Sequence, residues 1–250
     1  MENAITAGLS RQIVLARALE VTANNIANQT TAGFKADRAA FREYLASVPV
    51  NRTQTDINDP FVSLVVDRGS YTDFSGGALE PTYNAFDFAI DGDAFFAVDA
   101  NEGVRYTRDG GFSINAFGEL VTREGARVLD DSGAPILLNP EAGEPVATTL
   151  GELQQDGVPV ARIGLFSFEN PAALRKTGGN LFSAELSTEQ PIVDRTARLR
   201  QGFLETSNVA PITAVTDMIE ISRAYQQAAQ VVETADELAR DAINTLAERT

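Results

Sequence analysis

The sequence predicts an α+β protein, in which long N- and C-terminal helices pair as a coiled coil and a central, mainly antiparallel β domain lies between them along the chain. Two observations predict this class. Near both ends, apolar residues recur in alternating steps of three and four, which is typical of helices that pack along a seam. From Phe86 to Leu138, short runs of Phe, Ile, Val and Tyr are separated by turn dipeptides such as Asp-Gly and Gly-Gly. Short apolar runs separated by turn residues in this way are typical of β-hairpins.

Residues 1–35 are predicted to form the N-terminal helix and the motif through which the chain leaves it. The seam of this helix consists of Ile5, Leu9, Gln12, Ala16, Leu19, Ala23 and Ile26. Further apolar residues widen the face, namely Ile13, Val14, Leu15 and Val21. A helix that is apolar over so much of its surface is expected to have neighbours on more than one side.

Residues 36–75 are expected to form an extended linker region, because the stretch 48–60 ("VPVNRTQTDINDP") is rich in Pro and polar residues. Residues 76–200 are expected to form the central β domain. Within it, "VARIGLFSF" at 160–168 is another strong strand candidate.

Residues 201–250 are predicted to form the C-terminal helix, with Pro211 in its first turn, where proline is tolerated. Its seam is formed by Met218, Ile221, Tyr225, Ala228, Val232, Ala235, Ala239, Ala242 and Leu246. The alanines allow another helix to approach closely. Each terminal helix has its own extended seam, so the two are expected to pair, and we interpret the chain as a subunit of a polymer.

Composition excludes several functions. The 250 residues contain no Cys and no His, so a thiol nucleophile, an imidazole base and a Cys/His metal site are ruled out. The net charge of −15 argues against binding to nucleic acid or to anionic membranes. No apolar run approaches the roughly 18 residues of a membrane span, and the first residues do not have the pattern of a cleavable signal peptide.

Candidate catalytic and metal-binding residues are few. Asp91, Asp93 and Asp99 do not follow the order of an EF-hand loop, and Asp91-Gly92-Asp93 is better interpreted as a hairpin turn. The Gly-Gly pairs lack the lysine of a phosphate-binding loop. We therefore expect no enzyme activity, no cofactor and no metal site.

Three asparagines at the predicted end of the first helix, Asn24, Asn25 and Asn28, lie three or four residues apart on one helical face. One interpretation is a frayed helix end, with Gly33 as the left-handed stop. The other is a buried polar face between subunits, since a buried Asn can set the register of packed helices. The residues alone leave both open.

Several segments resemble the flagellar basal-body rod and hook family. "ANNIANQTTAGFK" (23–35) is similar to its signature A-N-N-x-A-N-x-x-T-x-G-[FY]-[KR]. Residues 201–226 are similar to the second signature, G-x-L-E-x-S-N-V followed by a long helix with R-A-[YF]; the matching residues are Gly202, Leu204, Glu205, Ser207, Asn208, Val209, Arg223, Ala224 and Tyr225. The segment 89–125 resembles the family's β domain. Within the family, the opening of the chain and residues 66–90 are most similar to the proximal rod type.

The resemblance implies a structural subunit of the flagellar rod that polymerises through its terminal helices and transmits torque. It implies export by the flagellar type III apparatus without a cleaved signal, assembly with itself and other rod subunits in the periplasm, and no insertion into a membrane. The assembly interface is then expected to include Asn24, Asn25, Asn28, Gly33, Phe34, Leu204, Glu205, Ser207, Asn208, Val209, Met218, Ile221, Tyr225, Val232, Ala235, Ala239 and Leu246. Two alternatives are a distal rod or hook protein of the same family, and a cell-wall carbohydrate-binding or carbohydrate-active β domain.

Overall fold

The computed structural model describes residues 2–47, 61–100, 103–184 and 190–247. The chain divides into two units. The helical unit contains residues 1–27, 37–72 and 210–250, and the β unit contains residues 28–36 and 73–209. Each unit is therefore built from segments that are distant in the sequence.

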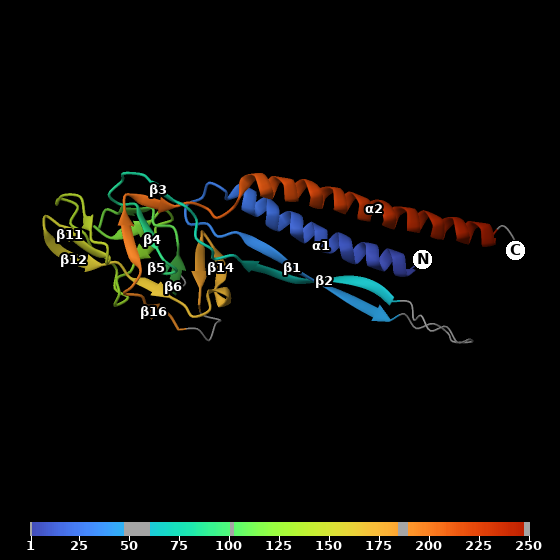
Figure 1. Ribbon diagram of the computed structural model, residues 1–250, viewed down its shortest axis with the longest axis horizontal. Coiled ribbons are helices and arrows are strands. Elements are labelled where there is room, and N and C mark those ends of the chain that lie inside the picture. Colours follow the sequence, from blue (N-terminus) through green and yellow to red (C-terminus); the bar gives the residue numbers. More distant parts are fainter. Residues whose placement is uncertain (1, 48–60, 101–102, 185–189, 248–250) are drawn as a thin grey trace. The chain divides into compact units, whose positions relative to one another are not determined.

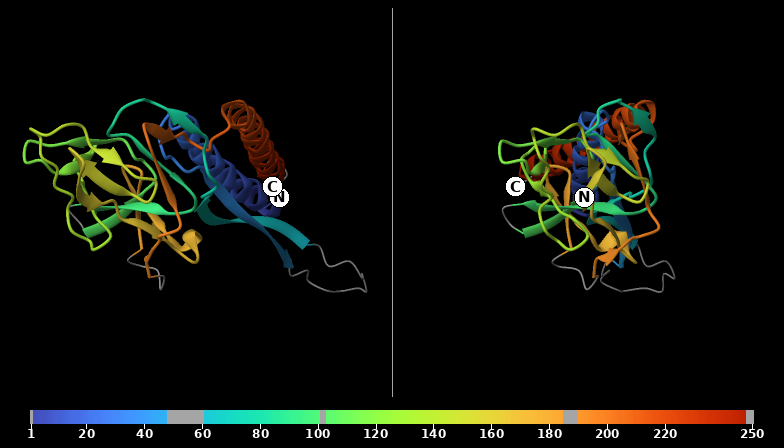
Figure 2. Two further views of the ribbon diagram at one scale, coloured as in Figure 1. Left: turned by 60° about the vertical axis from the view of Figure 1, so that its left-hand side comes forward. Right: turned by 90° about the vertical axis from the view of Figure 1, so that its left-hand side faces the viewer.

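The helical unit contains α1 (Glu2–Ala27), α2 (Pro211–Ala247) and a two-stranded antiparallel ribbon of β1 (Asp37–Ser47) and β2 (Phe61–Thr72). The two helices lie side by side in both Figure 1 and Figure 2. They come very close at Gly8, where an added Cβ would lie 2.5 Å from Cγ2 of Val232. The predicted helices are confirmed, and α2 begins at Pro211 as expected.

The most buried stripe of α1 differs from the predicted heptad seam. It consists of Val14, Ala18 and Val21, whereas Leu9 of the seam is 50% exposed. The reason is that α1 packs against the β1–β2 ribbon as well as against α2, so its buried face turns toward both neighbours. On α2, Ala228 and Ala235 of the predicted seam are buried.

Residues 36–75, which the sequence suggested as an extended linker, contain the ribbon. Asp37 pairs with Thr72 and Ser47 pairs with Phe61, with one irregularity between Ala39 and Phe41. The strands are extended, but they belong to the same unit as the helices. Likewise residues 201–209 belong to the β unit and not to the C-terminal helix, because the chain there pairs with β strands before α2 starts.

The β unit consists of short strands whose pairings are all antiparallel among the described residues, which confirms the mainly antiparallel β domain. Its largest sheet has the order β14-β15-β6-β5-β9-β8-β7, with β13 pairing both β5 and β16; β10-β11-β12, β17-β4 and β18-β3 form smaller sheets. The strands are β3 Leu79–Pro81, β4 Phe88–Asp91, β5 Phe95–Ala100, β6 Gly103–Thr107, β7 Phe112–Ile114, β8 Leu120–Thr122, β9 Arg127–Val128, β10 Val146–Ala147, β11 Glu152–Gln155, β12 Val158–Arg162, β13 Leu165–Ser167, β14 Arg175–Gly178, β15 Leu181–Ser183, β16 Ile192–Val193, β17 Arg198–Gln201 and β18 Phe203–Glu205, with a short 3-10 turn at Pro171–Ala173.

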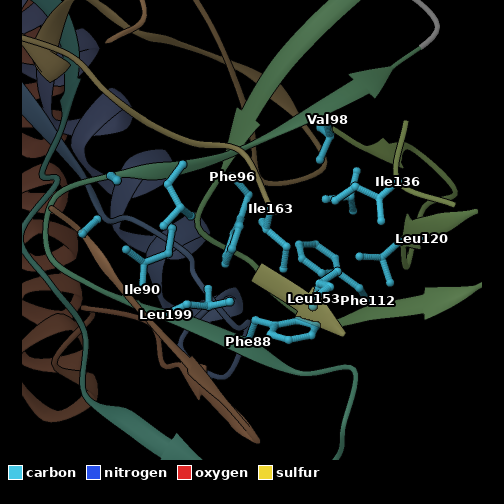
Figure 3. Close-up of a cluster of buried hydrophobic side chains, with 14 of the residues drawn as sticks. Phe88, Ile90, Phe96, Val98, Phe112, Leu120, Ile136, Leu153, Ile163 and Leu199 are labelled. Atoms are coloured by element: carbon cyan, nitrogen blue, oxygen red, sulfur yellow. The ribbon is translucent and has the colours of Figure 1, made fainter. Parts of the chain in front are cut away.

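Two hydrophobic clusters lie on opposite faces of β5. Phe96 and Val98 point into the larger cluster and Phe95 into the smaller one, because successive side chains of a strand alternate between faces. Figure 3 shows the larger cluster, in which the rings of Phe96 and Phe112 meet edge to face at 5.1 Å. The central strand is thus buried on both sides, which explains why its sequence is a continuous apolar run.

None of the helices in the described part of the chain is both long enough and apolar enough to cross a membrane.

Candidate assembly site

The chain leaves α1 through a tight turn. The backbone N–H of Thr31 donates to the carbonyl of Asn28 at 3.2 Å, and the hydroxyl of Thr31 donates to the Asn28 side chain at 3.2 Å. Gly33 then adopts φ +64°, and a Cβ at this position would lie 2.3 Å from the backbone of Arg108 and Asp109. Only glycine combines this left-handed conformation with such a close approach.

Asn25 is a link inside the helical unit. Its side-chain nitrogen donates to the carbonyl of Asp37 at 2.7 Å, and its side-chain oxygen accepts from the N–H of Asp37 at 2.9 Å. The amide therefore pairs with one residue of β1 as a strand neighbour would. For Asn25 this excludes a frayed, solvated helix end.

Residues 33–36, at the end of the N-terminal signature, pair with residues 205–208 of the C-terminal signature inside the β unit. The N–H of Gly33 donates to the carbonyl of Glu205 at 2.7 Å, and the N–H of Asn208 donates to the carbonyl of Phe34 at 3.3 Å. The Asn208 side chain extends this pairing, because it accepts from the N–H of Ala36 at 2.7 Å and donates to the carbonyl of Asp73 at 2.8 Å. The two signatures are thus joined although they lie far apart in the sequence.

A buried charge cluster lies beneath this pairing. The Lys35 ammonium is 2.6 Å from one carboxylate oxygen of Glu205, and the Arg108 guanidinium is 3.4 Å from the other. Their side chains are almost completely buried, with exposed fractions of 0% for Lys35, 3% for Arg108 and 2% for Glu205. One carboxylate therefore pairs with two cations, and the three groups together carry a net charge of +1.

Backbone groups also form hydrogen bonds with the charge cluster. Lys35 donates to the carbonyl of Ser75 at 2.7 Å, and the N–H of Gly77 donates to Glu205 at 2.8 Å. The guanidinium carbon of Arg108 lies 4.9 Å from the ring centre of Phe95, while the buried Nε of Arg108 has no hydrogen-bond partner. Burial lowers the pKa of both Lys35 and Arg108, and the attraction of Glu205 opposes that shift.

Phe34 is buried and held by a second lysine. The Lys176 ammonium lies 4.3 Å from the centre of the Phe34 ring and donates to the carbonyl of Lys35 at 2.5 Å. Asn180 donates to the carbonyl of Ala32 at 2.8 Å. Residues of the β14–β15 hairpin thereby hold residues 32–35 in addition to residues 205–208, so this stretch is bound by several segments of its own chain.

Comparison with known proteins places this arrangement in a family. Three family models match the chain: "Flagella basal body rod protein" over residues 5–35, "Flagellar hook protein FlgE/F/G D1 domain" over residues 89–158, and "Flagellar basal body rod FlgEFG protein C-terminal" over residues 200–245. The flagellar basal-body rod protein FlgF of Caulobacter vibrioides is 41% identical over 247 residues, which cover 98% of each chain. FlgF of Mesorhizobium japonicum is 37% identical over 247 residues, again 98% of each chain. FlgG of Bacillus subtilis is 31% identical over 264 aligned positions, covering 98% of this chain and 99% of the relative.

The chain belongs to the flagellar basal-body rod protein family. Within that family it is of the FlgF type. It is a structural protein of the flagellar basal body and not an enzyme, since the family is non-enzymatic. This membership decides against the carbohydrate-active alternative.

The structure brings together the family residues of the two signatures. Gly33, Phe34, Glu205 and Ser207 are buried within the rod protein itself, and Leu204, Asn208 and Val209 are half-buried beside them. Asn24 is exposed and Asn28 is half-buried. Sequence reasoning did not select Arg108, which completes the charge cluster, because nothing in its local pattern "YTRDGG" marks an arginine as buried. Lys35 stood in the recognised motif, but its partner was not foreseen.

The seam residues of α2 lie along a partly exposed helix face. Met218 and Tyr225 are exposed, Ile221 and Val232 are half-buried, and Ala235 is buried. The side chains of Ala239 and Leu246 lie outside the described residues. An open groove on α2 is lined by Gln227, Gln230, Val231, Thr234, Ala235 and Leu238.

Asp91, one of the acidic residues considered for metal binding, forms an ion pair between two strands. The Asp91 carboxylate accepts from Arg200 at 2.8 Å across the β4–β17 pair. In the described ranges, no three acidic side chains gather closely enough to hold a metal ion.

Proposed function

We propose that this rod protein is a proximal rod subunit that polymerises through its paired terminal helices. The pairing is proposed to be a coiled coil, continued in the polymer by helices of neighbouring subunits. The partners are then other copies of the chain and other rod subunits, and the proposed location is the periplasmic part of the rod, where the polymer transmits torque.

The observation that supports this proposal is the apolar surface left on both helices. On α1, Leu9 and Ile13 are exposed, although they belong to its apolar face. Among the described side chains of α2, the large apolar ones that are exposed are Ile212, Val215, Met218, Ile219, Tyr225, Val231 and Leu238. Apolar surface of this extent along helices is typical of surfaces that bind partner proteins. In a polymer, neighbouring helices would remove it from water.

The buried signature residues support a division of roles. We propose that Gly33, Phe34, Glu205 and Ser207 act by positioning the helix connections, because their burial inside one subunit favours internal contacts. Asn24, Asn28 and the α2 seam, including Ala239 and Leu246, are proposed to contact neighbouring subunits. Export by the type III apparatus without a cleaved signal peptide is supported by the family resemblance.

The test is incorporation into basal bodies. In a strain that lacks the natural gene, the double variant Val231→Ser/Leu238→Ser should be made and exported but excluded from rods, because it makes the groove face of α2 polar. Gln226→Ser, at an exposed position outside that groove, is the matched control and should assemble normally. Electron microscopy of purified basal bodies, together with immunodetection of the subunit, measures the outcome. Normal incorporation of the double variant would refute assembly through this face, and normal rods in the strain without the gene would refute the assignment to the rod.

A further inference from the structure

The pairing between residues 33–36 and 205–208 is short, and its backbone alone specifies its alignment weakly. Two backbone hydrogen bonds join the segments, one at 2.7 Å and one at 3.3 Å. Short pairings without a strong side-chain pattern are prone to slip, and a slip by one residue turns every side chain to the opposite face. Residues 203–205 are also paired with β3, and Gly33 packs against residues 108–109, so the question is which side chains add to these contacts in selecting the alignment.

We propose that Lys35, Arg108 and Glu205 form a register key, which selects the observed alignment of residues 33–36 with 205–208 and thereby the axial offset of α1 against α2. The carboxylate of Glu205 receives Lys35, Arg108 and the N–H of Gly77 at once. After a slip of one residue, this carboxylate would face the other way. Lys35 and Arg108 would then remain buried without the carboxylate that pairs with them directly, and only the more distant charges of Asp73 and Asp93 would oppose their burial.

Neutral contacts select the alignment less strongly. Asn208 also bonds to Ala36 and Asp73 in the observed alignment, but it is half-buried, so water can replace these partners after a slip. Water cannot reach Lys35 or Arg108, whose side chains are at most 3% exposed. An unpaired buried charge is disfavoured far more than an unpaired exposed amide. The charges therefore discriminate between alignments more sharply than the amide does.

The alignment is connected to the helices by short pieces of chain. Residues 28–32 join the end of α1 to the pairing, and residues 209–210 join the pairing to the start of α2. Connections this short absorb little of a slip, so the slip passes into the offset between the helices. A single buried polar group sets the register of coiled coils in the same way.

The test uses the absence of natural cysteine. A Cβ built at Gly8 lies 3.9 Å from Cβ of Val232, within the roughly 3.5–4.5 Å that a disulfide requires. Gly8→Cys/Val232→Cys therefore reports the native offset, and Val232→Cys also removes the branched side chain that a Cβ at Gly8 would meet. Ile5→Cys/Val232→Cys and Gln12→Cys/Val232→Cys report offsets displaced by about one helical turn in each direction.

Each cysteine pair is placed in the natural background, in Glu205→Gln and in the triple variant Lys35→Met/Arg108→Met/Glu205→Leu. Glu152→Gln is the matched control, because it removes an exposed carboxylate that lies 3.6 Å from Arg162. Cross-linking of the isolated full chain under mild oxidation is measured by gel shift, and folding by circular dichroism. The experiment needs no rod, so it stands apart from the assembly test above.

In the natural background and in Glu152→Gln, cross-linking is expected only for the Gly8/Val232 pair. In the triple variant the fold should persist, because apolar residues of similar size replace buried ion pairs without loss of stability. Its Gly8/Val232 yield should nevertheless fall several-fold, and displaced pairs should appear. If Glu205→Gln folds, it should show the same loss of native cross-linking and the same displaced cross-links. If it unfolds, the result of the triple variant tests the proposal. A folded triple variant that cross-links only at the native pair would overturn the proposal. A triple variant that fails to fold would also overturn it, because the charges would then be needed to close the fold and not to choose its register.

Discussion

Adding one methyl group at Gly33 should destabilise the β unit more than at most other glycines. The residue has φ +64°, and the new Cβ would lie 2.3 Å from Arg108 C and Asp109 N. These are backbone atoms, so they cannot rotate away. The left-handed conformation costs a non-glycine residue about 1–2 kcal/mol, and overpacking adds about 1–3 kcal/mol. Gly33→Ala should therefore lower the free energy of unfolding by about 2–5 kcal/mol.

Two other glycines separate these contributions. Gly133 has φ +86° but no atom within 4 Å of an added Cβ, so Gly133→Ala tests backbone strain alone. Gly76 has open space and no left-handed backbone, so Gly76→Ala should be neutral or stabilise by up to about 1 kcal/mol. Urea unfolding followed by circular dichroism measures all three. Equal effects of Gly33→Ala and Gly133→Ala would show that the close approach to residues 108–109 is not as described.

Three further predictions concern other parts of the chain. Asn25→Ala should destabilise the helical unit by about 1–3 kcal/mol, because the backbone groups of Asp37 lose their partner; hydrogen exchange at the end of α1 measures this, and unchanged exchange would contradict the link. Ala235→Leu should destabilise the helix pair by about 1–3 kcal/mol through overpacking at a buried position, seen as a lower melting temperature, whereas an unchanged value would mean that this face has free space. Burial raises the pKa of the Asp109 carboxyl, so its ionised form destabilises the fold at neutral pH. Asp109→Asn keeps the oxygen that accepts from the N–H of Gly111, so it should be more stable than the natural chain at neutral pH. Urea midpoints should show that this difference in stability shrinks as the pH falls through the raised pKa of Asp109 toward the ordinary value of 3.8. A difference that grows on acidification would refute the assignment.

The sequence was sufficient to predict the class of each region, because that information is local. Helical spacing of apolar residues predicted α1 and α2, and Pro211 predicted where α2 begins. Turn dipeptides predicted the hairpins of the β unit, since glycine and aspartate favour the backbone conformations that turns require. The signature motifs pointed to the family for the same reason, since each is a short contiguous pattern.

Contacts between distant residues were decided only by the tertiary structure. The sequence suggested a linker at 36–75, but this region contains the paired strands β1 and β2. Because α1 packs against this ribbon as well as against α2, its most buried residues are Val14, Ala18 and Val21 and not those of the predicted seam. Lys35 and Glu205 are 170 residues apart, and Arg108 and Glu205 are 97 apart. The periodicity of apolar residues shows which face of a helix or strand is apolar, but it does not show which other segment will cover that face. The buried charge cluster follows from the path of the whole chain, because that path brings two cations to one carboxylate and removes water from all three.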